Sequence, residues 1–141
     1  IFLKKKIEIL MNVFLMYIKS IVKEIVMNKL KTIVKVLDEK LANDITVIDM
    51  SIDSPICDYF VIASASNQNQ VQAMVDNVDE TLGRAGFEAK QIEGTRNSSW
   101  VLMDYGDMII HIFDEENRLF YDLERIWRDG KVLEMDAFLE K

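Results

Sequence analysis

The chain has 141 residues, half of them apolar, and a formal net charge of −7 at pH 7. This length and composition predict one domain that buries a hydrophobic core. The single cysteine, Cys57, excludes an internal disulfide framework, and we expect a reducing, cytoplasmic setting.

The charge is distributed unevenly along the chain. Residues 1–26 carry five lysines and two glutamates, so the remaining residues carry a net charge of about −10. A surface this acidic is repelled by the phosphate backbone of nucleic acids. We therefore expect no direct, sequence-specific binding of nucleic acid. If the chain acts near nucleic acid, we expect it to bind a basic protein there.

Residues 1–26 combine a basic start with an apolar stretch, as a signal peptide does. However, Glu8 and Asn12 interrupt the apolar run, and no small-x-small cleavage site follows. The run is also too short to span a bilayer, so we expect no membrane partner. A surface-lying amphipathic helix, and with it a membrane-associated regulator, is the alternative interpretation of this segment.

We interpret residues 1–26 as a non-native or leader-derived extension. The pair Lys23-Glu24 can be encoded by AAGGAG, a bacterial ribosome-binding sequence, at a workable spacing before the codon for Met27. The interpretation places the start of the native domain at Met27, and genomic DNA without a purine-rich core at the Lys23-Glu24 codons would contradict it.

Hydrophobic periodicity predicts the first elements of the domain. Apolar residues at helical spacing predict one face of an amphipathic helix that ends at Asn43-Asp44. These residues are Leu30, Ile33, Val34, Leu37 and Leu41. The β-branched stretch 45–50 predicts a strand, and 53–55 predicts a turn. The almost unbroken apolar run 58–65 predicts a central strand that is buried on both faces.

The second half of the domain predicts two more helices and three strands. Ser66 or Asn67 can cap a helix, and Asn67 with Gln70 resembles a capping box. Strands are predicted at 89–94, 100–104 and 108–113, the last two joined by a turn at Tyr105-Gly106. A last helix, capped by Asp114 or Asn117, has an apolar face formed by Leu119, Leu123, Ile126 and Trp127.

Gly130 ends this helix, and an acidic tail follows at 131–141. The order is α-β-β-α-β-β-β-α, which predicts a single α/β domain with a mixed β-sheet flanked by helices.

Acidic residues near the only histidine raise the question of a metal site. Asp104, Asp107, His111 and Asp114 are residue types that bind metals. Side chains alternate along a strand, however, and the two aspartates 104 and 107 flank a turn. We therefore expect no metal site. We expect Asp104 and Asp107 to be turn residues and His111 to be a half-buried residue of a strand.

Catalytic and cofactor sites are not supported either. Cys57 could pair with His111, but no Gly-rich oxyanion loop adjoins it, so we expect a buried structural thiol. The predicted strand–helix junction reads ASASNQNQ, without the Gly and Lys of a phosphate-binding loop. Helix capping explains its polar run, with weak anion binding as the alternative. We expect no catalytic residue and no cofactor.

Aromatic side chains lie beside acidic ones in the last third of the chain. These residues are Trp100, Tyr105, Phe113, Phe120, Tyr121 and Trp127, with Asp104, Asp107, Glu116 and Glu124. Most of the rings must belong to the core, but helical spacing predicts that Tyr121 is exposed. A patch of aromatic and acidic groups suits the docking of a basic protein surface.

Several stretches together resemble the bacterial ribosomal silencing factors, also called the Iojap family. The stretches are CDYFVIASAS (57–66), QVQAMVDNV (70–78), EG (93–94), WVLMDYGDMIIHIF (100–113) and RLFYDLERIW (118–127). The resemblance covers about residues 28–128, and we assign the silencing-factor domain to residues 27–130.

The resemblance implies a function that needs no catalysis. Members of the family bind the large ribosomal subunit through its protein fourteen, block joining of the small subunit, and lower translation when nutrients are short. The family fold resembles nucleotidyltransferases, which need a Gly-Ser loop and an Asp-x-Asp pair. Here the loop reads ASASN, and Asp49 and Asp53 are four apart. The alternative, a divergent nucleotide-binding or nucleotidyltransferase-like protein, therefore lacks its catalytic carboxylates.

We expect the partner-binding residues to surround the DYGD turn. The resemblance supports these positions as motif members, while their individual contacts are our inference. The hairpin contributes Asp104, Tyr105 and Asp107, its expected neighbours are Asp58, Tyr59, Glu93 and Trp100, and the second choices are Tyr121 and Glu124. Exposed sheet edges also make a homodimer of the free chain plausible.

Overall fold

The computed structural model describes residues 1–50, 57–94, 98–120 and 130–139. The chain divides into two compact units, residues 1–30 and residues 31–141, and helix α1 (Phe2–Glu39) runs through the boundary. In the first unit, large apolar side chains such as Leu10 and Phe14 are more than half exposed. Within the described ranges, no helix combines the length and the apolar character needed to cross a bilayer.

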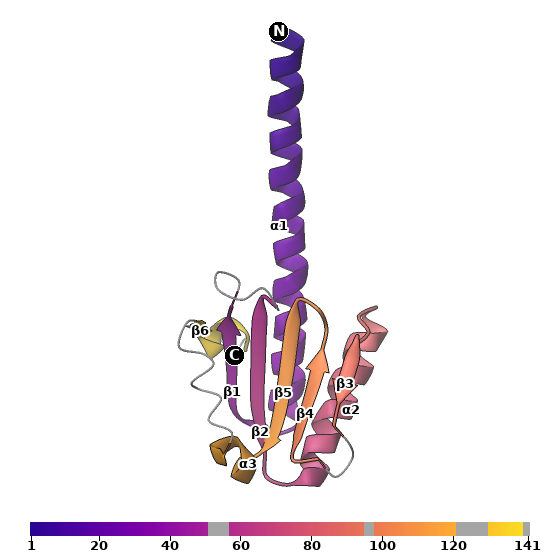
Figure 1. Ribbon diagram of the computed structural model, residues 1–141, viewed down its shortest axis with the longest axis vertical. Coiled ribbons are helices and arrows are strands. Elements are labelled where there is room, and N and C mark those ends of the chain that lie inside the picture. Colours follow the sequence, from indigo (N-terminus) through magenta and orange to yellow (C-terminus); the bar gives the residue numbers. More distant parts are fainter. Residues whose placement is uncertain (51–56, 95–97, 121–129, 140–141) are drawn as a thin grey trace. The chain divides into compact units, whose positions relative to one another are not determined.

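The second unit is built on a six-stranded mixed sheet (Figure 1). The strand order is β3-β4-β5-β2-β1-β6, in which β2 and β5 are parallel and all other neighbours are antiparallel. The strands are β1 (Asn43–Asp49), β2 (Tyr59–Ala65), β3 (Gln91–Glu93), β4 (Trp100–Asp104), β5 (Met108–Asp114) and β6 (Lys131–Leu133). The predicted α/β class with a mixed β-sheet is therefore confirmed.

Strand β2 occupies the central position that its unbroken apolar sequence predicts. It lies between β1 and β5, and its residues from Val61 to Ala65 are all buried. Side chains alternate between the two faces of the sheet, so this burial removes apolar groups on both sides of β2 from water. The parallel register places Ile62 beside His111 and Phe60 beside Ile109.

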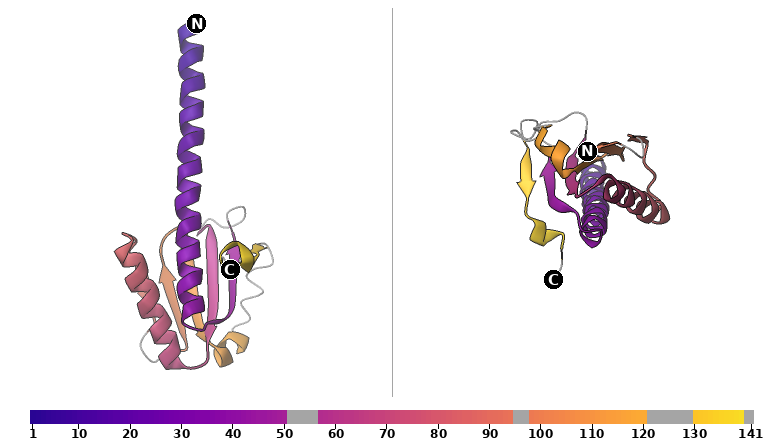
Figure 2. Two further views of the ribbon diagram at one scale, coloured as in Figure 1. Left: turned by 180° about the vertical axis from the view of Figure 1, so that it is seen from behind. Right: turned by 90° about the horizontal axis from the view of Figure 1, so that it is seen from below.

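Helices cover one face of the sheet. Helix α2 (Gln68–Arg84) begins as predicted, because the side chain of Asn67 accepts the N–H of Gln70 at 2.9 Å. Its buried stripe consists of Val71, Met74, Val75, Val78 and Leu82. Figure 2 shows α2 and the last turns of α1, from residue 31 onwards, on the same face of the sheet.

The end of α1 differs from its prediction. The helix ends at Glu39, and Leu41 has a positive φ of 63° and a side chain that is 75% exposed. Leu41 therefore lies beyond the helix and contributes nothing to its apolar face. The amide of Ala42 donates to the carbonyl of Leu37 at 2.9 Å, which closes the last turn.

The acidic segment after residue 130 contains a strand that the sequence pattern did not predict. Strand β6 pairs with β1, placing Lys131 opposite Asp49, and a short 3-10 helix η2 (Met135–Ala137) follows. Gly130 enters this strand in close contact with β1, since a Cβ atom at this position would lie 2.4 Å from Ile48 Cγ2. Glycine is needed there because of this close approach.

Helix α3 (Glu115–Phe120) begins at the end of β5. The carboxylate of Asp114 accepts the N–H of Asn117 at 2.8 Å, which confirms Asp114 as the predicted cap. The guanidinium of Arg118 donates to the carbonyl of Asp44 and to the hydroxyl of Ser64, both at 2.7 Å, and ties α3 to β1 and β2. The predicted turn at 53–55 and the predicted helix residues Leu123, Ile126 and Trp127 lie outside the described residues.

Both edges of the sheet are short and exposed. Strand β3 presents Ile92, which is 40% exposed, and β6 presents Val132, which is 60% exposed. Edge strands of three residues offer few backbone groups for pairing. Pairing of two copies of the free chain stays a prediction.

Candidate protein-binding site

The face of the sheet opposite α2 carries a cluster of aromatic and aliphatic side chains. Alternation along β4 turns Val101 and Met103 into the helix-covered core and leaves Trp100, Leu102 and Asp104 partly exposed. The register then places Trp100 beside Phe113, and Leu102 beside His111. We call this set the aromatic face, formed by Phe60, Trp100, Leu102, Ile109, His111 and Phe113.

The rings of the aromatic face pack in defined geometries. The indole of Trp100 stacks on Phe113 with ring centroids 5.1 Å apart and an interplanar angle of 19°. The imidazole of His111 meets the ring of Phe60 edge-on at 5.3 Å. Such arrangements are favourable for aromatic pairs. Phe113 is fully buried, whereas Trp100 and Phe60 are only partly buried, so the exposed part of the cluster is available to a partner.

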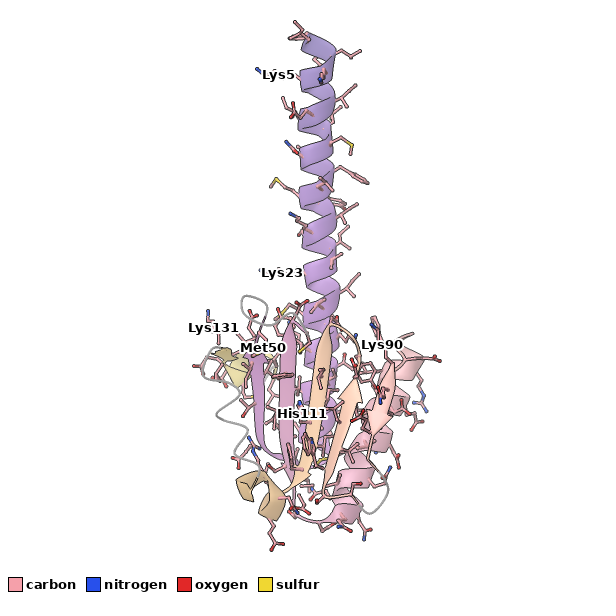
Figure 3. All side chains as sticks on the ribbon, in the orientation of Figure 1. Lys5, Lys23, Met50, Lys90, His111 and Lys131 are labelled. Atoms are coloured by element: carbon pink, nitrogen blue, oxygen red, sulfur yellow. The ribbon has the colours of Figure 1, made fainter. Side chains whose placement is uncertain are left out.

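His111 lies at the centre of this face (Figure 3). Its Nδ1 accepts a hydrogen bond from Nε1 of Trp100 at 3.2 Å, so the imidazole carries its proton on Nε2. Burial lowers the pKa of His111 to about 4. The ring is therefore neutral at physiological pH, and at 8% exposure it is more deeply buried than the half-buried residue that the sequence predicts.

The carboxylates considered as metal ligands in the sequence do not lie together. Asp104 and Asp107 flank the turn at one end of β5, whereas Asp114 lies at its other end and caps α3. Among the residues that the structure describes, no three His, Cys, Asp or Glu side chains are arranged to hold a metal ion.

The DYGD segment forms the predicted hairpin turn between β4 and β5. The carboxylate of Asp104 accepts the N–H of Gly106 at 2.8 Å, and the N–H of Tyr105 donates to the carbonyl of Met108 at 2.9 Å. Gly106 has a φ of 88°, which a residue with a side chain rarely adopts. The local sequence therefore explains the turn.

Tyr105, which is one of the predicted partner-binding residues of the turn, does not lie at the surface. Its side chain is only 6% exposed. Burial, with a further contribution from the carboxylate of Asp79 on α2, raises the pKa of Tyr105 to about 12. The ring turns from the hairpin towards the helix-covered core, where a partner cannot reach it without rearrangement.

Four carboxylates gather at the same end of the sheet as this turn. We call Asp49, Asp58, Asp104 and Asp107 the acidic edge. Backbone hydrogen bonds bring their segments together: the N–H of Met50 donates to the carbonyl of Asp58, and the N–H of Asp58 donates to that of Asp107. The predicted neighbours Asp58 and Asp107 are therefore adjacent in space.

The carboxylates of the acidic edge contribute to raised pKa values of two neighbouring side chains. Burial, with the charges of Asp58, Asp104 and Asp107, raises the pKa of Cys57 to about 11. Burial and the charges of the edge also raise the pKa of Tyr59, which is partly exposed. Cys57 is 5% exposed and thus a protonated, buried thiol, as predicted.

The remaining predicted site residues are divided between the described and undescribed parts of the chain. Glu93 is exposed on β3 and pairs in register with Leu102, which places it on the side of the aromatic face. Its carboxylate accepts a hydrogen bond from the side chain of Gln91 at 2.6 Å. Tyr121 and Glu124 lie outside the described residues.

Three members of the aromatic face are not among the residues predicted from the sequence: Phe60, Leu102 and Ile109. Leu102 could have been found by alternation from Trp100 along the same strand. Phe60 joins the face only because β2 and β5 pair in parallel, and this register follows from packing of the whole sheet.

The loop between β2 and α2 uses its polar groups for structure. The side chain of Gln70 accepts the N–H of Ser66 at 2.7 Å and donates to the carbonyl of Lys40 at 2.9 Å, while Asn67 caps the helix. The prediction that capping explains this polar run is confirmed. Of the proposed carboxylate pair, Asp49 lies at the end of β1 and Asp53 lies outside the described residues.

Comparison with known proteins identifies relatives over most of the chain. Residues 23–141 match the family model described as ribosomal silencing factor during starvation. A ribosomal silencing factor of Bacillus subtilis is 35% identical over 107 residues, which cover 76% of this chain and 91% of the relative. The mouse protein named mitochondrial assembly of ribosomal large subunit protein 1 is 32% identical over 98 residues, which cover 67% of this chain and 43% of the relative.

A solved structure shares the fold. A crystal structure of a Bacillus halodurans protein matches with a TM-score of 0.67 and 31% sequence identity, covering 74% of this chain and 95% of that one.

Proposed function

The chain belongs to the ribosomal silencing factor family, also known as the Iojap family, and we propose that it represses translation by occupying the large ribosomal subunit. On this proposal, the chain binds ribosomal protein fourteen on the face that the small subunit approaches. The bound chain prevents subunit joining by steric exclusion when nutrients are limiting. The observation that supports this best is the aromatic face with carboxylates beside it.

The aromatic face has the composition of the centre of a protein–protein interface. Partly exposed aromatic and aliphatic groups such as Trp100, Phe60 and Leu102 can be desolvated by a partner at little cost. Tryptophan is also enriched among the few residues that contribute most binding energy. Asp104 and Glu93 border this apolar centre as a polar rim.

The charge of the domain favours a basic protein over RNA as the direct partner. The net charge of about −10 outside residues 1–26 is repelled by phosphates and attracted by a basic surface. Complementary charge raises the rate of encounter and fixes orientation more than it raises affinity. The acidic edge would therefore direct the aromatic face towards a basic ribosomal protein.

The proposed mechanism has no chemical step and takes place in the cytoplasm, where subunits join. Occupying the interface is sufficient, so no catalytic residue is required. The alternative, a nucleotide-binding or nucleotidyltransferase-like activity, is not favoured because Ser66, Asn67 and Gln70 are engaged in capping α2.

Burial and position change which residues we propose as contacts. Trp100 and Glu93 lie on or beside the aromatic face, and Asp58, Asp104 and Asp107 lie on the acidic edge with Tyr59 nearby. Tyr105 is withdrawn as a direct contact because it is buried. Tyr121 and Glu124 stay predictions.

Sedimentation with isolated ribosomal subunits tests the proposal. The chain should pellet with large subunits and not with small ones. Leu102→Asn should weaken this binding, whereas Ile92→Asn, a matched change at a strand residue on the opposite side of the sheet, should leave it unchanged. A folded chain that binds neither subunit, or a Leu102→Asn variant that binds as tightly as the original chain, would contradict the proposal.

A further inference from the structure

We propose that His111 is a positioning residue for the docking surface: its neutral Nδ1 holds the indole of Trp100 in the orientation that meets the partner. The inference rests on the proposed function, since it assigns a role within the same site. The hydrogen bond from Trp100 to His111 adds a polar contact beneath a docking surface that otherwise consists of apolar side chains.

The geometry gives the indole two independent restraints. Phe113 lies parallel to the indole and fixes the plane of the ring. The bond from Nε1 of Trp100 to Nδ1 of His111, 3.2 Å long, fixes which edge of the ring points inwards. Stacking alone would permit a flipped rotamer in the same plane, whereas stacking plus one directional hydrogen bond selects a single rotamer.

The two residues belong to neighbouring strands and are diagonal partners. Trp100 pairs in register with Phe113, and His111 pairs with Leu102, two residues further along β4. Diagonal neighbours on one face lie within reach of long aromatic side chains. The contact therefore depends on the β4–β5 register that the hairpin turn sets.

A packing role alone does not explain a histidine at this position. Burial of a polar ring is unfavourable unless the ring is hydrogen-bonded, and a phenylalanine or leucine would fill the same space without that cost. His111 is 8% exposed and packs against Phe60 and Phe113. Its acceptor nitrogen is directed at the one ring N–H that Trp100 carries, which a hydrocarbon side chain could not bind.

A restrained indole should bind more tightly than a mobile one. A partner that docks on a mobile tryptophan must first order it, and this ordering weakens binding. Loss of the restraint should therefore weaken binding of the large subunit by about 3- to 10-fold without unfolding the chain.

The test compares full-length variants that distinguish loss of the hydrogen-bond acceptor from loss of the aromatic ring. His111→Phe keeps a ring and removes the acceptor, and His111→Asn places an amide oxygen near the position of Nδ1. Trp100→Phe removes the donor, and the double variant closes a cycle. Two quantities are measured: the Kd for isolated large subunits, and the hydrogen exchange rate of the Trp100 indole N–H by NMR in the free chain.

We expect His111→Phe to raise the Kd about 3- to 10-fold and to speed indole exchange, with His111→Asn recovering most of both. In the Trp100→Phe background, His111→Phe should have no further effect on the Kd. An unchanged Kd in His111→Phe, a His111→Asn variant as weak as His111→Phe, or an equal loss in the Trp100→Phe background would each overturn the inference.

The two readouts distinguish this inference from the proposed function. If the original chain fails to bind large subunits, the proposed function is wrong, and the docking role of His111 is wrong with it. The exchange measurement in the free chain would still decide whether His111 holds Trp100. If the original chain binds and the variants do not differ, only the role of His111 is wrong.

Discussion

The single histidine shows how burial decides the chemistry available to one side chain. Its neighbours Trp100, Phe60 and Phe113 exclude water, and the resulting low pKa removes it from acid–base chemistry near neutral pH. The same burial couples its protonation to folding.

Stability should therefore depend on pH through His111. Its pKa is about 4 in the folded chain and 6.5 in the unfolded chain, so between these values the unfolded state binds more protons. The free energy of unfolding should fall as the pH falls from 6.5 to 4, by up to about 3 kcal/mol. Urea unfolding at pH values from 7 to 4, compared with His111→Asn, isolates this contribution. Parallel pH profiles for the two chains would contradict the assignment.

A charge reversal at the acidic edge should weaken docking. Asp107→Lys replaces a partly exposed carboxylate with a cation beside Asp58 and Asp104, and should weaken binding of the large subunit by about 1–3 kcal/mol if the carboxylate is desolvated on binding. Asp76→Lys makes the same charge change on the exposed surface of α2 and serves as the control.

Titration of large subunits with both variants measures this effect, with circular dichroism to confirm folding. Equal affinities for Asp107→Lys and Asp76→Lys would show that only the net charge matters, and would remove Asp107 from the contact surface.

For single residues, the sequence predicts the backbone conformation better than it predicts the burial of the side chain. The turn at Gly106 follows from a local preference, whereas the burial of Tyr105 depends on where α2 packs. A turn residue can point to either side of its hairpin, and only the tertiary structure decides between them.

Among the elements, α2 should depend measurably on its N-terminal cap. Asn67→Ala removes the acceptor for the N–H of Gln70 and should lower the free energy of unfolding by about 1 kcal/mol. Asn67→Ser keeps a side-chain oxygen in the cap and should lose less. Urea unfolding of the three chains measures the difference, and equal stabilities would show that the cap contributes nothing to the fold.

Elements with strong periodicity could be predicted, whereas the short strand β6 could not. The apolar stripe of α2 and the apolar run of β2 extend over enough residues to establish their type. Strand β6 has three residues, too few to show alternation, and exists because β1 pairs with it. The parallel pairing of β2 with β5, which brings Phe60 into the site, joins segments about fifty residues apart and leaves no local signal.

For the whole molecule, we expect residues 1–26 to be dispensable for ribosome binding. The matched family region begins at residue 23, and every described residue of the candidate site lies in the unit from residue 31 onwards. A chain of residues 27–141 should retain the fold by circular dichroism and bind large subunits within about twofold of the affinity of the full chain. A loss of binding in the shorter chain, with its fold intact, would contradict this expectation.

The central claim is that the bound chain keeps the two ribosomal subunits apart. The most direct measurement is subunit joining in a sucrose gradient as the chain is titrated onto large subunits. We predict that joined ribosomes disappear in proportion to occupancy, and that Leu102→Asn needs a higher concentration to produce the same loss. Joined ribosomes that carry the chain would contradict the account.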